Sequence, residues 1–176
     1  MNNDLLKLAR ETIKCKLENK TVFIPEELKK KYAGYQACFV TLTIENKLRG
    51  CIGTLKPIKE LYKDVIDNAI QSAFNDPRFP PLKKTDLNRI KIEISILSIP
   101  KKLDYKDEKD LLKKINKKMG IILKNGFYSS TFLPQVWEQL QEKTSFLEHL
   151  GVKAGLSKDS WKTSEFWFYT VKSIKE

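Results

Sequence analysis

The chain contains few of the residues that build metal centres and disulfide frameworks. Its 176 residues include three cysteines, Cys15, Cys38 and Cys51, and one histidine, His149. An odd number of cysteines without Cys-x-x-Cys spacing argues against a disulfide framework and a zinc site, and favours a reducing compartment. One histidine with dispersed acids is a poor set of metal ligands. We therefore expect three free thiols and no metal or other cofactor.

Long apolar runs are also missing. The longest have about four members, whereas a helix that crosses a bilayer needs ~20. The first ten residues lack the basic segment followed by an apolar segment that marks a signal peptide. With an apolar fraction of 41% and a charged fraction of 31%, the composition predicts a soluble, folded, cytoplasmic protein with no membrane partner.

Arginine is scarce although the chain is strongly basic. The formal net charge is +11, but 29 of the 33 basic residues are lysine. Arginine carries the fork that reads phosphates and guanine edges, whereas dispersed lysines mostly keep a protein in solution. The lysines are also interspersed with acids, as in residues 101–118. We therefore expect any binding to nucleic acid to be weak, independent of sequence and sensitive to salt, and we expect no dedicated nucleic-acid partner.

The pattern of apolar residues predicts an α+β fold. Helical spacing of apolar residues and alternating β-branched residues separate the elements of the first half: a helix over 4–19, strands over 36–44 and 48–55 joined at Asn46-Lys47, a helix over 59–74 and a strand over 90–96. The second half gives a helix over 107–119 closed by Gly120, a hairpin over 120–133 turning at Asn125-Gly126, a helix over 144–154 and a strand over 165–172.

Each half therefore has the order hairpin, helix, strand. We predict two hairpin–helix–strand repeats that form a compact layered fold with an N-terminal helix packed on them. We expect a single domain over residues 1–176 with two lobes, at about 36–98 and 107–172.

The segment Leu48–Thr54, with the sequence LRGCIGT, is unusual for a strand because it contains two glycines. Each glycine weakens a strand by about 0.5–1 kcal/mol relative to alanine, and such glycines mark a bulge or the close approach of a ligand or backbone. A turn at Asn46-Lys47 would pair Cys51 with Leu42 and place Arg49 and Cys51 together on the apolar face. A guanidinium there needs a partner, so either a bulge at Gly50 turns it outward or it lines a polar pocket.

Two interpretations of this segment stay open. In one, Arg49 clamps an anion and Cys51 is a reactive thiolate favoured by the nearby positive charge. In the other, Cys51 is a small core residue, because free cysteine is often buried. His149 fits a surface or core-edge position better than the role of a general base.

A second candidate segment is Asn75–Leu82, in which three prolines restrict the backbone. A rigid loop that presents Arg78 and Phe79 suits ligand recognition. The alternative is a helix stop followed by a connector, with Phe79 in the core. Glu93 and Ser95 face away from the isoleucine stripe and either line a cleft or meet water.

These segments together resemble the AMMECR-domain family, whose bacterial and archaeal members include the A component of the AmmeMemoRadiSam system. The resemblance extends over about residues 4–172. The matching segments are LRGCIG at 48–53, DPRFPPL at 76–82, IEISIL at 92–97, LPQV at 133–136 and KAGL at 153–156. Family members often carry a cysteine just before KAGL, where this chain has Gly151, so we expect no two-cysteine mechanism.

The resemblance implies an α+β fold of duplicated units, an activity that is not established, and Memo-like and radical-SAM proteins as partners. Our leading hypothesis is a cleft around LRGCIG that binds a small anionic molecule or modified group. Cys51 is the candidate catalytic residue, and the candidate ligand-binding residues are Arg49, Gly50, Gly53, Thr54, Arg78, Phe79 and Glu93. The alternatives are a thiol-dependent enzyme that uses Cys51, for which no base is evident, and a weak nucleic-acid-binding module.

Overall fold

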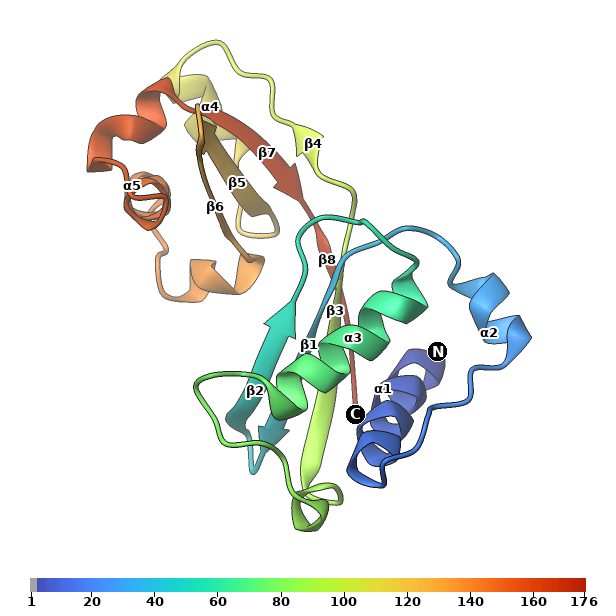
Figure 1. The fold of residues 1–176 in the computed structure, drawn as a ribbon. Coiled ribbons are helices and arrows are strands. Elements are labelled where there is room, and N and C mark those ends of the chain that lie inside the picture. The colour runs from blue at the N-terminus through green and yellow to red at the C-terminus, as the bar shows by residue number, and fades with distance from the viewer. Residues whose placement is uncertain (1–2) are drawn as a thin grey trace. The chain divides into compact units, whose positions relative to one another are not determined.

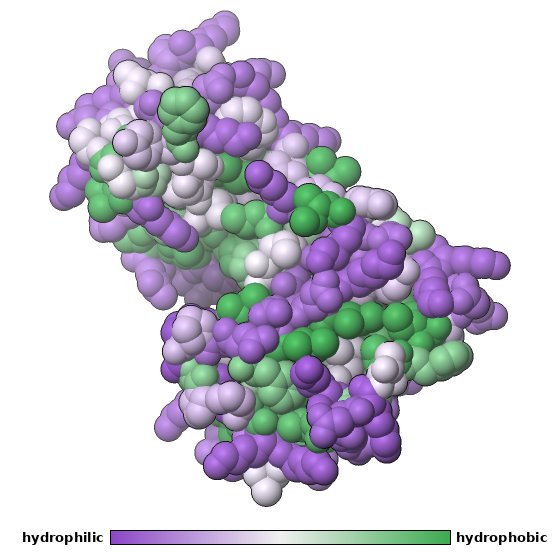
Figure 2. All heavy atoms as spheres, viewed as in Figure 1, coloured by the Kyte–Doolittle hydropathy of each residue, from purple (hydrophilic) through white to green (hydrophobic). Residues whose placement is uncertain are grey.

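The computed structural model describes residues 3–176 and divides them into two compact units (Figure 1). Unit 1 runs to Leu97 and also contains Lys172–Glu176, and unit 2 is Ser98–Val171. Each unit contains helices and a four-stranded sheet, which confirms the predicted α+β class. Within the described residues, no helix is both long and apolar enough to cross a membrane. Hydrophilic side chains make up most of the visible surface of each unit, with hydrophobic patches between them (Figure 2).

Unit 1 has a sheet with the strand order β2-β1-β3-β8, so β2 is an edge strand. Helices α1 and α3 pack on this sheet and on each other. The elements are α1 (Asn3–Leu17), α2 (Glu26–Lys31), β1 (Cys38–Ile44), β2 (Lys47–Gly53), α3 (Leu61–Phe74), the 3-10 helix η1 (Lys84–Asp86), β3 (Ile90–Leu97) and β8 (Val171–Lys175).

Alternation along the strands decides which face of the unit 1 sheet is covered. Val40 and Leu42 of β1 and the isoleucines of β3 are buried on one face, with Val65 and Ala69 of α3 in the same core. The intervening residues point to the opposite face because successive side chains in a strand alternate. That opposite face carries Thr41 and Glu93, which are directly paired between β1 and β3.

Unit 2 has a sheet with the order β4-β7-β5-β6. Its core contains Phe146, Leu150 and Trp137 from the helical segments and Phe166 from the sheet. The elements are β4 (Lys101–Lys102), α4 (Glu108–Lys114), β5 (Gly120–Asn125), β6 (Tyr128–Phe132), the 3-10 helix η2 (Pro134–Glu138), α5 (Lys143–Lys153), the 3-10 helix η3 (Lys158–Thr163) and β7 (Glu165–Tyr169).

Both units contain a hairpin, a helix and a third strand that pairs with the first strand of the hairpin: β1, β2, α3 and β3 in unit 1, and β5, β6, α5 and β7 in unit 2. That the two arrangements are repeats of one unit stays a prediction, and so does the single domain with two lobes.

Three predicted elements were wrong in detail. The helix predicted over 107–119 ends at Lys114, and Gly120, which was expected to close it, is the first residue of β5. A Cβ at Gly120 would lie 2.3 Å from the Tyr169 ring, so this position has no room for a side chain. The strand predicted over 165–172 is two strands, β7 and β8, that belong to different sheets. The segment between the predicted helix over 4–19 and the predicted strand over 36–44, to which no element was assigned, contains the short helix α2, whose six residues carry no buried side chain to indicate it.

Candidate functional site

The β1–β2 hairpin turns one residue earlier than predicted. Glu45 and Asn46 have φ values of 53° and 62°, the left-handed conformation that a two-residue type I′ turn requires at both central positions. Beyond the turn the register shifts, so that Leu42 pairs with Gly50 and Thr43 with Leu48. Arg49 is therefore the extra residue of a β-bulge.

This bulge corrects the predicted position of Cys51. Cys51 pairs with Thr41 and not with Leu42, so it lies on the face opposite the helix-covered core. Arg49 and Cys51 do not share the apolar face. A shift of one residue moves every side chain of a strand to the other face, which is why the predicted arrangement was wrong.

Two glycines in the segment are required by close neighbours. A Cβ at Gly50 would lie 2.0 Å from the Ser72 carbonyl oxygen of α3, and a Cβ at Gly53 would lie 2.3 Å from the Phe39 ring. The expectation of close approach is confirmed at both positions. The neighbours come from the protein itself, so both glycines have a structural explanation that involves no ligand.

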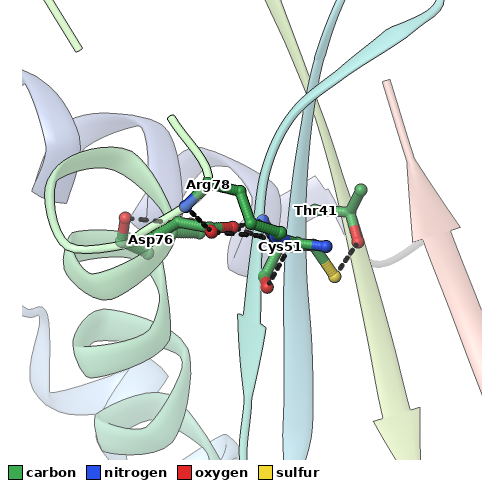
Figure 3. A network of polar contacts seen from close by, with 6 residues as sticks. Thr41, Cys51, Asp76 and Arg78 are labelled. Carbon is green, nitrogen blue, oxygen red and sulfur yellow. Dashed lines mark hydrogen bonds and ion pairs between the residues drawn. The ribbon is translucent and has the colours of Figure 1, made fainter. Parts of the chain in front are cut away.

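Cys51 is half-buried and lies in a polar row that crosses three strands. The Thr41 hydroxyl donates to the Cys51 sulfur at 3.3 Å (Figure 3), and Thr41 pairs on its other side with Glu93. Cys38, by contrast, is 0% exposed, and this burial raises the pKa of its thiol well above the usual range. None of the three cysteines forms a disulfide, as predicted.

The loop after α3 places a carboxylate and a guanidinium against the backbone of the edge strand β2. The Cys51 backbone N–H donates to Asp76 Oδ2 at 2.8 Å, and Arg78 Nη2 donates to the Cys51 carbonyl at 3.1 Å (Figure 3). The Arg78 guanidinium also donates two hydrogen bonds to the Asp76 carboxylate, from Nε at 2.9 Å and from Nη2 at 2.7 Å. The two side chains thus satisfy the backbone groups of an edge strand where a neighbouring strand would otherwise pair.

Burial and charge differ sharply within this pair. The Asp76 side chain is 2% exposed and the Arg78 side chain is 54% exposed. Hydrogen bonds from Arg78, with further ones from backbone N–H groups, hold the pKa of the Asp76 carboxyl well below its usual range. The pKa of the Arg78 guanidinium is raised, mainly by Asp76 and to a smaller extent by Cys51. Asp76 is therefore an ionised anchor, and Arg78 presents its charge to solvent.

Arg49 occupies a different environment. Its Nη2 lies 3.7 Å from the Asp86 carboxylate, and the two side chains are 15% and 18% exposed. The Arg49 Nη1 atom is buried without a hydrogen-bond partner among the described residues. The structure therefore places Arg49 in a mostly enclosed ion pair with η1.

Thr54 belongs to a buried network at the start of α3. Its hydroxyl donates to Asp64 Oδ2 at 2.7 Å, and the same oxygen accepts the Cys38 backbone N–H at 2.8 Å and the Asn68 side chain at 3.0 Å. Asp64 is 1% exposed, so this network fixes the end of β2 against β1.

The remaining candidates lie at the surface. Phe79 is half-buried under the Arg78 guanidinium, whose carbon lies 5.5 Å from the ring centroid. His149 of α5 is exposed, and its Nδ1 lies 2.8 Å from the Ser145 carbonyl of its own helix. Over residues 3–176, no group of three or more His, Cys, Asp or Glu side chains is arranged to hold a metal ion.

The order and spacing of these segments can be compared with known proteins. The sequence profile of the AMMECR1 family matches residues 6–174, which is almost the whole chain. The chain belongs to the AMMECR1 family. The resemblance seen in LRGCIG and DPRFPPL is thereby confirmed.

Relatives of this AMMECR1-family chain occur in archaea and bacteria. A protein from Nanoarchaeum equitans is 41% identical over 161 residues, covering 90% of this chain and 89% of the relative. One from Aquifex aeolicus is 37% identical over 174 residues, covering 94% and 87%. The crystal structure of an uncharacterized protein from Pyrococcus horikoshii matches with a TM-score of 0.84 and 32% identity, covering 98% of this chain and 89% of that one.

Two residues of this candidate site, Asp76 and Thr41, are not among the site residues predicted from the sequence. Asp76 is predicted only as a member of the Asn75–Leu82 segment and of DPRFPPL, with no role of its own, and Thr41 only as a residue of the strand over 36–44. A signal for Asp76 exists: in Asp-Pro-Arg the aspartate can accept the backbone N–H two residues on, and Asp76 Oδ1 accepts the Arg78 N–H at 3.1 Å. Thr41 had no such signal because its role follows from the bulge.

Proposed function

We propose that this AMMECR1-family protein binds a small anionic molecule or an anionic modified group beside Cys51, with Arg78 as the anion contact. The observation that carries the proposal is the arrangement of the Asp76–Arg78 pair. The carboxylate is buried and the guanidinium is exposed, so the charge that faces solvent beside Cys51 is positive. Within the described residues, Nη1 of Arg78 donates to no protein acceptor, so its two N–H groups are free for a ligand.

Preorganisation supports the same assignment. The bidentate bond to Asp76 fixes the guanidinium before any ligand arrives, so its ordering does not weaken binding. Arg49 is enclosed with Asp86 and serves in this proposal as a positioning residue of the bulge, not as an anion contact. Phe79 supports the Arg78 guanidinium, and Glu93 borders the row through Thr41.

The rate of alkylation at Cys51 tests the proposal with reagents that differ in charge. Iodoacetate is an anion and iodoacetamide is neutral, so the ratio of their rates reports the local potential at a thiol. We expect Arg78→Gln to lower this ratio at Cys51 by about threefold or more, on the basis of a partly screened charge pair. Arg49→Gln removes the same charge and should change the ratio less.

Cys15 is the internal control. The charged group beside its sulfur is Glu11, at 3.8 Å, so Arg78→Gln should leave the ratio of iodoacetate to iodoacetamide rates at Cys15 unchanged. Inorganic phosphate should slow the modification of Cys51 by iodoacetate in the wild type and not in Arg78→Gln. An unchanged ratio at Cys51 in Arg78→Gln, in a variant that keeps its circular dichroism spectrum, would refute the proposed anion site.

A second candidate function is thiol-dependent chemistry at Cys51. It is favoured by the Thr41 hydroxyl on the Cys51 sulfur and by Glu93 next to Thr41 in the same row. If the row acts as a unit, Thr41→Val and Glu93→Gln should both slow the reaction of Cys51 with the neutral iodoacetamide. If only Thr41→Val has an effect, Glu93 takes no part.

We further infer, from the family resemblance, that the protein acts with Memo-like and radical-SAM proteins. The test is co-purification of the full chain with a purified Memo-like protein at micromolar concentration. Arg78→Gln and wild type should be compared, because a partner that delivers an anionic group to Cys51 should depend on Arg78. If neither the wild type nor Arg78→Gln forms a complex, the proposed partnership is contradicted. The proposed anion site is not affected by that result, because the alkylation rates test it separately.

A further inference from the structure

The face of the unit 2 sheet that points away from the core carries an aromatic ring between two lysines. Trp167 of β7 pairs with Lys102 of β4 on one side and with Ile122 of β5 on the other. Ile122 in turn pairs with Thr131 of β6. The neighbouring residue Phe166 is buried in the core, so Trp167 points to the opposite face because side chains alternate along a strand.

The charges of this face gather over the indole ring. Lys124 Nζ lies 4.1 Å and Lys102 Nζ 5.6 Å from the Trp167 ring. Lys102 also pairs with Glu165 at 2.5 Å, whereas Lys124 has no ion pair among the described residues. Trp167 itself is half-buried, unlike Trp137 and Trp161, which are both 2% exposed. The face thus combines a half-buried aromatic ring with two lysines and one carboxylate, because Glu165 pairs across the strands with Lys124 and forms an ion pair with Lys102.

We propose that this face binds single-stranded nucleic acid, with a base stacked on Trp167 and phosphates near Lys124 and Lys102. A sheet face with an exposed aromatic ring and flanking cations is the arrangement on which single strands stack. The base would take the place of the Lys124 ammonium over the ring, and the ammonium would move to an adjacent phosphate. This inference rests on unit 2 residues alone and is independent of the proposed site at Cys51.

The dimensions favour a strand over a single nucleotide. The row from Lys102 to Thr131 crosses four strands, a span of about 14 Å at the usual spacing between strands. A single base covers only part of that length. The row contains no arginine, asparagine or glutamine that would read a base edge, so binding should be independent of base sequence.

Titration of the full chain with an eight-residue oligouridylate at low salt tests this proposal. Binding should quench the fluorescence of Trp167, because the other two tryptophans are buried. Trp167→Leu should weaken binding by about fivefold or more, whereas Trp167→Phe should retain most of it, since stacking on one aromatic ring accounts for that range. Lys124→Gln should weaken binding and reduce the slope of log K against log salt by about 0.7, the value for one phosphate contact on a single strand.

Lys162→Gln is the matched control. Lys162 Nζ also lies over a tryptophan, 6.0 Å from the Trp161 ring, but that ring is buried and the lysine pairs with Asp159. The variant removes the same charge and should leave binding unchanged.

Several outcomes would overturn the proposal. These are no binding by the wild type at low salt, equal binding by Trp167→Leu and wild type, or equal losses in Lys162→Gln and Lys124→Gln. Binding of uridine monophosphate as tight as that of the octamer would indicate a nucleotide site, and equal affinity for duplex RNA would indicate nonspecific charge attraction. If Trp167→Leu does not fold, Trp167→Phe and Lys124→Gln provide the test. Binding by Lys124→Gln as tight as that of the wild type would then overturn the proposal.

Discussion

Replacing Asp76 by asparagine should destabilise unit 1, because this buried carboxylate connects the loop after α3 to the edge strand β2. Asp76 is 2% exposed and accepts hydrogen bonds from the Cys51 backbone, the Arg78 backbone and the Arg78 guanidinium. An asparagine oxygen can replace one of these acceptors, but its NH₂ group would face donors. The variant therefore loses the ion pair and also buries a mismatched polar group.

The expected loss of unfolding free energy depends on how far the Asp76 and Arg78 side chains are exposed to water. Removing one partner of a fully buried ion pair costs about 3–5 kcal/mol. The Arg78 side chain is 54% exposed, so water can solvate it once Asp76 is neutral, and the cost must be reduced for this screening. We expect Asp76→Asn to lower the free energy of unfolding by about 2 kcal/mol at pH 7.

The same residue predicts how stability depends on pH. The pKa of Asp76 in the folded state is depressed below its usual 3.8, so the folded state favours the ionised form. Its contribution to stability is complete well above the unfolded-state pKa and is lost as the pH falls through the lower, folded-state pKa. The difference in stability between wild type and Asp76→Asn should therefore shrink as the pH is lowered from 5 towards 2.

The assay must report on unit 1. All three tryptophans lie in unit 2, so tryptophan fluorescence would miss the effect. Urea unfolding followed by far-ultraviolet circular dichroism gives the global free energy, and the alkylation rate of the fully buried Cys38 gives the opening of unit 1 directly.

Asp67→Asn is the control on α3, because Asp67 forms an ion pair with Lys59 while 52% exposed and should cost less than about 0.5 kcal/mol. A loss at Asp76 no larger than this control, or a difference from wild type that does not shrink in acid, would refute the reasoning.

Three further predictions test the fold and the cysteines. Gly50→Ala should lower the free energy of unfolding by about 2 kcal/mol, because its Cβ would lie 2.0 Å from a carbonyl oxygen of α3. Gly34→Ala, with nothing within 4 Å, should stay within about 0.5 kcal/mol of wild type in the same urea titration. In the native protein Cys51 should react with iodoacetamide at least about tenfold faster than buried Cys38, and peptide mass spectrometry that finds equal rates would contradict this. Arg10→Gln should cost about 1 kcal/mol in thermal unfolding, because Arg10 makes a part-exposed bidentate ion pair with the side chain of the last residue.

Local patterns in the sequence were sufficient for most elements. The alternating isoleucines over 90–96 form β3, and the hairpin indicated by Asn125-Gly126 forms as well, but its turn lies one residue later than predicted, at Gly126-Phe127, where Gly126 has a φ of 57°. Such patterns depend on periods of two and 3.6 residues and on the conformational range of glycine, which operate between near neighbours in the chain. The N-terminal helix and α3 were found within a few residues of their observed ends for the same reason.

The glycines of LRGCIG show where local patterns stop being sufficient. Two glycines in a strand indicated that something approaches the backbone closely, and this was confirmed. The sequence could not indicate that the neighbours are Ser72 and Phe39. Neither could it show that the final strand divides between two sheets at Thr170, because the run of β-forming residues continues through Thr170 and Val171.

The face on which Cys51 lies was decided by tertiary structure alone. The pattern around LRGCIG fixed a hairpin with an arginine and a cysteine two residues apart, but a bulge between them reverses the face of every later residue. That bulge forms where Gly50 packs against α3, a contact between segments 22 residues apart in sequence. The pairing of Cys51 with Asp76 and Arg78 likewise exists only once α3 returns the chain to the edge of β2, because hydrogen bonds between residues 25 and 27 positions apart leave no period in the sequence to detect.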